Sequence, residues 1–209
     1  MEIIGEYGSR ASDTVIIQLT GDHELSLIEN EIKLIRELAD TEDFRLIPVR
    51  IDDWNKELSP WESPAVFGDE SFGSGAENTL ENLLKEVLPQ YTGRIYLGGY
   101  SLAGLFALWA CCNTDVFSGV AAVSPSAWFP GFVDYVRDNT PRTGAVYLSL
   151  GTKEEKTKNR TMATVGDCIR SIYENLKGSG IETVLEWNRG NHFAEPDLRM
   201  AKGFARLIK

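Results

Sequence analysis

The strongest constraint on the fold is a regular alternation of strand-like and helix-like segments along the chain. Six short runs are rich in β-branched and apolar residues, as β-strands are. These runs span residues 14–19, 44–51, 95–97, 119–123, 145–150 and 181–187. Segments with helical spacing of apolar residues lie between and after them, at 25–39, 76–88, 102–112, 130–137, 162–176 and 197–208. Such alternation predicts an α/β fold with a mostly parallel sheet of about six strands and helices on both faces.

Two of these helices carry explicit expectations for their buried faces. In the first helix, Ile28, Ile32, Ile35 and Ala39 recur at helical spacing with charges between them. In the last helix we expect Leu198, Ala201, Phe204 and Leu207 to share one face. Both patterns are typical of amphipathic helices that cover a sheet.

Length and composition favour a single domain over residues 1–209. Hydrophobic residues make up 43% of the 209-residue chain, which is enough for a sizeable core. Only about 20 residues separate Ser124 from Ala145, too few for a separate lid domain at that point. We therefore expect one domain without a separate lid.

Charge and cysteine usage limit the classes of partner. The net charge of −10 disfavours nucleic acid and anionic membranes, and no apolar run is long enough to span a bilayer. The cysteines, Cys111, Cys112 and Cys168, fit reduced core residues better than disulfides or metal ligands. The segment Gly99–Gly104 has the spacing of a phosphate-binding loop but lacks its lysine. We expect a cytoplasmic protein with no metal, no cofactor, no nucleic acid and no membrane partner; the oligomeric state stays open.

The third strand-like run leads into a serine at a sharp turn. The sequence Gly98-Gly99-Tyr100-Ser101-Leu102-Ala103-Gly104 joins this run to the helix that follows. Glycine at 99 leaves room for the turn, and the small Ala103 lets the helix approach the strand. This is a G-x-S-x-A form of the nucleophile elbow, which lifts a serine hydroxyl to the top of a sheet. An ordinary Gly-Ser turn is the alternative.

An acid and a histidine follow later strands. Glu154 and Glu155 come after the fifth strand, and His192 comes after the sixth. Because ligands bind beyond the carboxyl ends of parallel strands, we expect these residues beside Ser101. Ser…Glu…His is the order of α/β-hydrolase triads. We therefore predict Ser101, His192 and Glu154 as catalytic residues, with Glu155 as the alternative acid and a solvated charged loop as the plain alternative.

An oxyanion hole would be formed by backbone N–H groups from two places. Leu102, directly after the nucleophile, supplies one by its position. The loop after the first strand, residues 20–24, supplies the second, with Asp22 preferred to Gly21. We expect His23 to line the mouth of the site rather than act as the base, because its loop lies where the oxyanion donor belongs. A hydrogen-bonded loop histidine is the alternative.

A long segment, residues 52–75, carries an unusual number of aromatic side chains. They are Trp54, Trp61, Phe67 and Phe72. Loops of this length are usually functional or disordered, and four aromatic residues argue against disorder. We expect either a cap whose Trp54, Trp61 and Phe72 contact the substrate, or an irregular wrap over a hydrophobic sheet edge.

Four motifs together resemble one branch of the α/β-hydrolase superfamily. They are Gly98–Gly104, Ser124-Pro125-Ser126-Ala127-Trp128-Phe129, Gly151-Thr152-Lys153-Glu154 and Gly190-Asn191-His192-Phe193. They look like the branch that includes esterase D and the enterochelin-esterase-like enzymes, and the resemblance covers residues 14–208. It implies a triad of Ser101, His192 and Glu154 and a pocket wall formed by Trp128.

Two departures from that branch affect what we expect. Ala103 stands where the second glycine is usual, and alanine also fits such a crossing. The chain is short for the branch. The antiparallel strands that normally open the sheet are therefore expected to be reduced to Ile3–Tyr7 or absent.

The site and the resemblance together imply a serine hydrolase that cleaves a small carboxylic ester through an acyl-enzyme. A thioesterase or acyltransferase would use the same chemistry on a different acceptor. A catalytically silent scaffold that binds a ligand or partner is the alternative from another class. The intact Ser–Glu–His order favours the enzyme, because a silent copy is free to lose any member.

Overall fold

One sheet of eight strands organises the chain, and the computed structural model describes residues 1–209. The parallel strands are β3 (Thr14–Thr20), β4 (Arg45–Arg50), β5 (Arg94–Tyr100), β6 (Gly119–Val123), β7 (Ala145–Gly151) and β8 (Glu182–Asn188). Their order in the sheet is β4-β3-β5-β6-β7-β8. The expected mostly parallel α/β sheet of six longer strands is confirmed.

The antiparallel part of the sheet consists of two short pieces beside β4. β1 (Glu2–Ile3) and β2 (Tyr7–Gly8) both pair antiparallel with this strand, Glu2 opposite Arg50 and Tyr7 opposite Leu46. The strands are reduced as expected, although the paired residues lie at the ends of the 3–7 segment rather than along it. They protect most of an edge that would otherwise present unpaired backbone groups.

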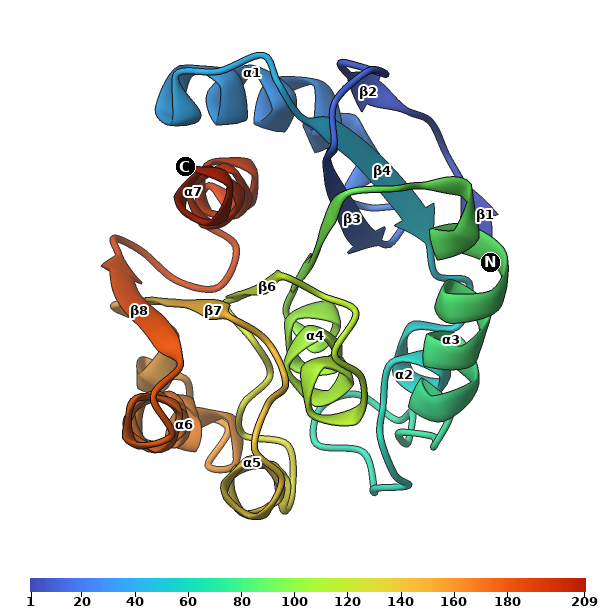
Figure 1. Cartoon of the computed structure of the whole chain (residues 1–209). Helices are drawn as coiled ribbons and strands as arrows, with labels where there is room; N and C mark the ends of the chain where they lie inside the picture. Colours follow the sequence, from blue (N-terminus) through green and yellow to red (C-terminus); the bar gives the residue numbers. More distant parts are fainter.

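Helices cover both faces of the sheet (Figure 1). One face carries α1 (Ile28–Ala39) and α7 (Pro196–Ile208). The other face carries α3 (Ala76–Asn82), α4 (Leu102–Asn113), α5 (Phe132–Asp138) and α6 (Val165–Gly178), with the single-turn α2 (Trp54–Glu57) beside them. The predicted 76–88 helix continues past α3 as a π-helical turn (Leu83–Val87) and a 3-10 turn (Leu88–Gln90) that contains Pro89. Further 3-10 turns are Leu25–Leu27, Glu154–Lys156 and Met162–Thr164.

The buried side chains form two hydrophobic clusters, one on each face of the sheet, because side chains alternate between the faces along each strand. In β3 every residue is buried; Val15, Ile17 and Leu19 face α4, and Ile16 faces α1 and α7. Successive side chains of a strand point to opposite faces, so a strand covered on both faces must be apolar throughout. The predicted face of α1, from Ile28 to Ala39, is buried as expected.

The buried face of α7 differs from the expectation. Ala201 and Phe204 are buried, but Leu198 and Leu207 are only partly buried, and Arg199 is buried instead. Each residue of an α-helix is rotated by about 100° about the helix axis from the one before it, so residues three apart differ in direction by about 60°. Over the nine residues from Leu198 to Leu207 the difference reaches about 180°, so the two leucines lie on opposite sides of the helix.

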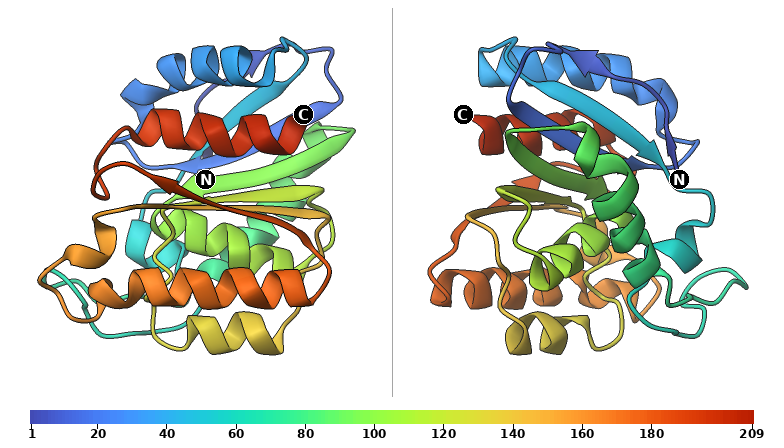
Figure 2. Two further views of the ribbon diagram at one scale, coloured as in Figure 1. Left: turned by 90° about the vertical axis from the view of Figure 1, so that its left-hand side faces the viewer. Right: turned by 45° about the vertical axis from the view of Figure 1, so that its right-hand side comes forward.

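The topology brings the candidate site residues to one end of the sheet. The loops that follow β7 and β8 leave the sheet on the same side, as the left view of Figure 2 shows. The elbow follows β5, which is separated from β7 by β6 alone in the strand order. None of the helices combines the length and apolar character needed to cross a membrane.

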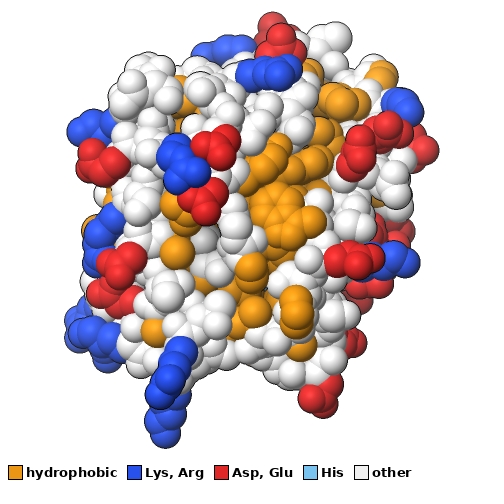
Figure 3. All heavy atoms as spheres, turned by 90° about the horizontal axis from the view of Figure 1, so that it is seen from below, with side chains coloured by type: hydrophobic (Ala, Val, Ile, Leu, Met, Phe, Trp, Pro, Cys, Tyr) orange, Lys and Arg blue, Asp and Glu red, His pale blue; other side chains and the backbone are white.

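The 52–75 segment runs over the side of the molecule that carries α5. It contains α2 and an isolated antiparallel bridge between Ser63 and Phe72. On this face hydrophobic side chains gather in the centre and charged side chains surround them (Figure 3). The segment is therefore ordered and packed against the body of the protein.

Candidate active site

Ser101 occupies a strained turn between β5 and α4. Its φ is 57° and its ψ is −118°, a conformation that non-glycine residues seldom adopt. Hydrogen bonds hold the turn: the Ser101 N–H donates to the Val123 carbonyl, and the Ser101 carbonyl accepts from Ser126 N–H, both at 3.0 Å. A Cβ on Gly99 would lie 2.4 Å from the Ala103 Cβ, so the close approach of strand and helix requires glycine there. The local geometry is that of a nucleophile elbow.

The structure brings Ser101, His192 and Glu154 together. His192 Nε2 lies 3.1 Å from Ser101 Oγ, and its Nδ1 lies 2.7 Å from Glu154 Oε2. The three side chains come from the loops after β5, β8 and β7, which are far apart in sequence but adjacent at the sheet end. A hydroxyl, an imidazole and a carboxylate in this line can pass a proton from the serine to the histidine.

Glu154 and Glu155 have very different surroundings. Glu154 is buried, and its Oε1 accepts from the Ser124 hydroxyl at 2.8 Å and the Gly151 N–H at 2.6 Å. Burial alone would raise the pKa of Glu154, but the hydrogen bond and charge of His192 and these further donors lower it below its usual value. Glu155 instead pairs with Arg170 at 3.0 Å on the surface. Only Glu154 reaches His192.

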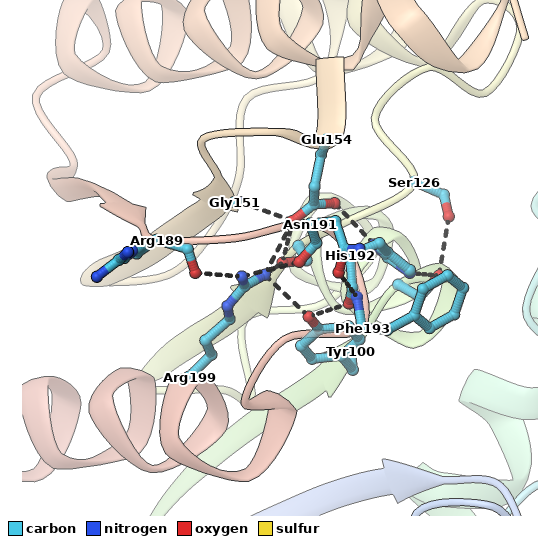
Figure 4. A network of polar contacts seen from close by, with 11 residues as sticks. Tyr100, Ser126, Gly151, Glu154, Arg189, Asn191, His192, Phe193 and Arg199 are labelled. Carbon is cyan, nitrogen blue, oxygen red and sulfur yellow. Dashed lines mark hydrogen bonds and ion pairs between the residues drawn. The ribbon is translucent and has the colours of Figure 1, made fainter. Parts of the chain in front are cut away.

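A buried arginine that the sequence did not identify joins this group (Figure 4). Arg199 of α7 is 1% exposed, and its Nη1 donates to Glu154 Oε1 at 3.0 Å. The same Nη1 lies 3.1 Å from both Tyr100 Oη and Ser124 Oγ. The Tyr100 hydroxyl donates to the His192 carbonyl at 2.6 Å. Its sequence neighbours, Met200 and Ala201, give no signal of this burial, because adjacent residues of a helix point in different directions.

The backbone N–H groups expected to form an oxyanion hole differ in whether they already donate a hydrogen bond within the protein. Leu102 is the first residue of α4, where an N–H has no partner inside the helix. The N–H of Gly21 donates to Glu24 Oε2 at 3.1 Å and is therefore occupied. Asp22 lies next to it in the same loop, and Ser126 places a hydroxyl 3.4 Å from Ser101 Oγ. The Asp22 N–H has no hydrogen-bond partner within the protein, and its role as the second donor stays a prediction.

A second carboxylate holds that loop in shape. Glu24 is buried, and besides Gly21 it accepts a hydrogen bond from the Thr20 hydroxyl at 3.2 Å. Burial raises the pKa of Glu24 above its usual value, although these donors and the imidazole of His23 oppose the shift. His23 lies at the rim of the pocket with a largely exposed ring that meets Trp54 edge-on at 5.6 Å.

A pocket of about 660 Å³ opens at Ser101 and His192. Of the expected substrate contacts, Trp128, Trp54 and His23 line it. Phe67 and Phe193 also line it, and they are the large hydrophobic side chains that the protein leaves exposed, at 51% and 84%. Lys153 and Lys156 lie on the same walls. The pocket is therefore aromatic, and its lining includes two lysines and two carboxyl groups, Glu24 and Glu154.

Two expected substrate contacts, Trp61 and Phe72, lie elsewhere. Trp61 packs on α5, its ring 5.5 Å from that of Tyr135, and its Nε1 donates to the Pro130 carbonyl. Phe72 is 3% exposed and packs against Phe129 behind Trp128, outside the lining of the Ser101 pocket. Neither residue lines the pocket at Ser101, because the segment folds back at the 63–72 bridge and these two rings pack against α5 and Phe129.

The described side chains offer no group of three or more His, Cys, Asp or Glu placed to hold a metal ion. The polar groups aligned at the pocket are instead an imidazole flanked by a carboxylate and a hydroxyl. Such an arrangement can activate a serine for attack on an electrophilic carbon.

The chain is only distantly similar in sequence to known proteins. No protein-family model matches it. A curated relative, "Uncharacterized protein YbbA" from Bacillus subtilis (strain 168), is 23% identical over 176 residues, covering 74% of this chain and 68% of that protein.

Solved structures are more informative about the fold. The siderophore hydrolases EstA and EstB from Aspergillus nidulans match 96% and 95% of this chain and 84% of each of theirs, with TM-scores of 0.74 and 0.76 at 19% and 16% identity. The enterobactin esterase FES from Shigella flexneri matches 97% of this chain with a TM-score of 0.65 at 14% identity, and the chain covers 54% of it. These matches confirm the α/β-hydrolase fold.

Proposed function

We propose that this protein is a serine esterase that hydrolyses a small carboxylic ester through an acyl-enzyme. The observation that carries the proposal is the unbroken line from Ser101 Oγ through His192 to Glu154, at 3.1 and 2.7 Å, at the base of an aromatic pocket. The structures with the same fold include proteins named as siderophore hydrolases and an enterobactin esterase, which supports ester hydrolysis.

In the proposed reaction the bonds change in two stages. Ser101 Oγ attacks the ester carbonyl carbon while His192 Nε2 takes its proton, and Glu154 holds the imidazole with Nδ1 protonated. The tetrahedral oxyanion accepts hydrogen bonds from the N–H groups of Leu102 and Asp22. Collapse breaks the bond to the alcohol, which leaves with the proton from His192. A water molecule then attacks the acyl-enzyme by the same route and releases the acid.

The walls of the pocket favour a flat apolar group in the substrate. Phe67 and Phe193 remain exposed there, although burying such rings against an aromatic ligand is favourable. Lys153 and Lys156 would attract an acidic substituent, although the net charge of the whole protein is −10. We therefore place an aromatic ester ahead of a simple aliphatic one.

We further propose that residues 1–209 act as a single domain in a reducing compartment such as the cytoplasm. The three cysteines form no disulfide, and two of them are buried in α4. Unbridged buried thiols are typical of proteins from reducing compartments.

Fluorophosphonate labelling tests the proposal most directly. Mass spectrometry of the labelled protein should place one adduct on the peptide that contains Ser101, and Ser101→Ala should remove it. Ser118→Ala, which changes a serine away from the pocket, should leave the adduct in place. A panel of p-nitrophenyl and aryl esters then defines the substrate. A protein that neither labels nor turns over any ester would instead be a binding scaffold, and transfer to a thiol or alcohol acceptor would indicate an acyltransferase.

A further inference from the structure

Arg199 is the one arginine whose side chain lies in the interior beside the candidate site. It is 1% exposed and projects from the first turn of α7 toward the ends of β5 and β7. Two features make this position costly. A buried charge loses its hydration, and a cation in the first turn of a helix opposes the positive end of the helix dipole. Its partners must therefore compensate for both effects.

Those partners belong to two separate loops. Nη1 donates to Glu154 Oε1, in the loop after β7, at 3.0 Å. Nη2 donates to the carbonyls of Arg189 and Asn191, in the loop after β8, at 3.2 and 2.9 Å. The second loop carries His192 directly after Asn191. One planar guanidinium thus bonds the acid on one side and the backbone that carries the histidine on the other, as Figure 4 shows.

Backbone hydrogen bonds join the bases of the two loops. The Thr152 N–H donates to the Asn188 carbonyl at 2.8 Å and the Lys153 N–H to the Gly190 carbonyl at 2.9 Å. Beyond Gly190, the direct hydrogen bond between the loops is the one from His192 to Glu154, and Tyr100 holds the His192 carbonyl from β5. Gly151 and Gly190 approach so closely that a Cβ on Gly151 would lie 2.6 Å from the Gly190 carbonyl oxygen and 2.9 Å from Arg199 Nη2. The two loops therefore touch at these glycines, and the guanidinium packs beside the contact, next to Gly151.

We propose that Arg199 is a positioning residue that sets the distance and angle between Glu154 and His192. Glu154 Oε1 is engaged by Arg199, Ser124 and Gly151, which leaves Oε2 for His192 Nδ1 alone. The carboxylate cannot rotate away from the imidazole without breaking a bond to the buried cation. Arg199 acts on the reaction through these two residues and touches neither Ser101 nor the pocket.

This inference rests on the proposed esterase function, so its test measures turnover per active site. In Arg199→Ala, Glu154 and the 189–192 loop both lose their shared partner. We expect kcat to fall by about 10- to 100-fold, the range for misplacing a catalytic group by about 1 Å. KM should stay within about threefold, because Arg199 does not line the pocket and the aromatic walls formed by Trp54, Phe67 and Trp128 belong to other segments. Active sites are counted by fluorophosphonate titration, so that unfolded protein does not enter kcat.

Rescue by a small ion separates positioning from general stability. The alanine variant leaves a hole shaped for a guanidinium ion, and guanidinium at about 20 mM, far below denaturing concentrations, should restore part of kcat. Lys202→Ala is the matched control, because Lys202 lies on the same helix and pairs with Glu186 at 2.6 Å and Asn188 at 2.8 Å. This control should keep the kcat of the parent and show no response to guanidinium.

Arg199→Lys keeps the inference testable if the alanine variant does not fold. An ammonium can still pair with Glu154, but it lacks the fork that reaches both loops, so kcat should lie between the alanine variant and the parent. A kcat per titrated site within about threefold of the parent in the folded variants would overturn the positioning role. If the parent itself lacks both turnover and a Ser101 adduct, the esterase proposal fails, and the role of Arg199 fails with it.

Discussion

Replacing Glu154 by glutamine changes one atom in the candidate site and has a definite structural consequence. Glu154 Oε1 accepts from Gly151 N–H, Ser124 Oγ and Arg199 Nη1 at 2.6, 2.8 and 3.0 Å, while Oε2 faces only His192 Nδ1, at 2.7 Å. An amide NH2 placed at Oε1 would face two obligatory N–H donors. The glutamine carbonyl must therefore take the Oε1 position, which turns the NH2 toward His192.

The imidazole then has to change its tautomer. Nδ1 must accept from the amide, so the proton moves to Nε2, which lies 3.1 Å from Ser101 Oγ. An Nε2 that carries a proton cannot take another from the serine. The same carboxylate-to-amide change in a serine protease triad lowers kcat by about 10⁴-fold, or about 5.5 kcal/mol at 1.36 kcal/mol per tenfold.

The assay compares Glu154→Gln with Glu155→Gln on p-nitrophenyl acetate, with active sites counted by titration. Glu155→Gln removes only a surface pair with Arg170, so its kcat should stay within about twofold of the parent. The tautomer reasoning is refuted if Glu154→Gln keeps kcat within about tenfold of the parent. The opposite ranking of the two variants would make Glu155 the acid.

Three further outcomes follow from the same structure. Ser101→Ala should lower turnover of p-nitrophenyl acetate by several orders of magnitude with little change in Tm; a rate within about tenfold of the parent would contradict its role. Trp61→Ala should lower the free energy of unfolding by roughly 2–4 kcal/mol, because Trp61 packs on α5, and should leave the preference among esters unchanged. Phe67→Ala should change the preference among esters and leave Tm unchanged, because Phe67 lines the pocket. Burial raises the pKa of Glu31 well above its usual value, so the folded state holds a proton that the unfolded state releases, and stability falls as pH rises above about 4.5. Urea denaturation should therefore show that Glu31→Gln is more stable than the parent at pH 7.5 but not at pH 4. The gain at pH 7.5 should be about 1.4 kcal/mol for each unit by which folding raises the pKa of Glu31. An equal gain at pH 4 and pH 7.5 would contradict the raised pKa.

The sequence determined the fold class because the relevant signals are local. Apolar runs of strand length alternate with helical spacing, and a parallel sheet covered on both faces is the arrangement that buries both kinds of segment. The elbow was also readable, since Gly99, Ser101 and Ala103 meet the steric demands of one turn. Placing Glu154 and His192 near Ser101 needed only the rule that loops after parallel strands meet at one end of the sheet.

Choices between neighbouring residues depended on the tertiary structure. Glu154 and Glu155 are chemically equal in sequence, and the 3-10 turn at 154–156 decides which one points inward. The 63–72 bridge in the same way turns Trp61 toward α5 and leaves Phe67 at the pocket.

Arg199 shows the limit most clearly. An arginine in a terminal helix is ordinarily a solvated surface residue, and composition and spacing predict nothing else for it. Its burial follows from the exact rotation of α7 over the sheet and from two loops, more than 30 residues apart in sequence, that present a carboxylate and two carbonyls to the same point. Periodicity along a chain fixes which faces are apolar, but the meeting of distant polar groups is decided only when those faces pack.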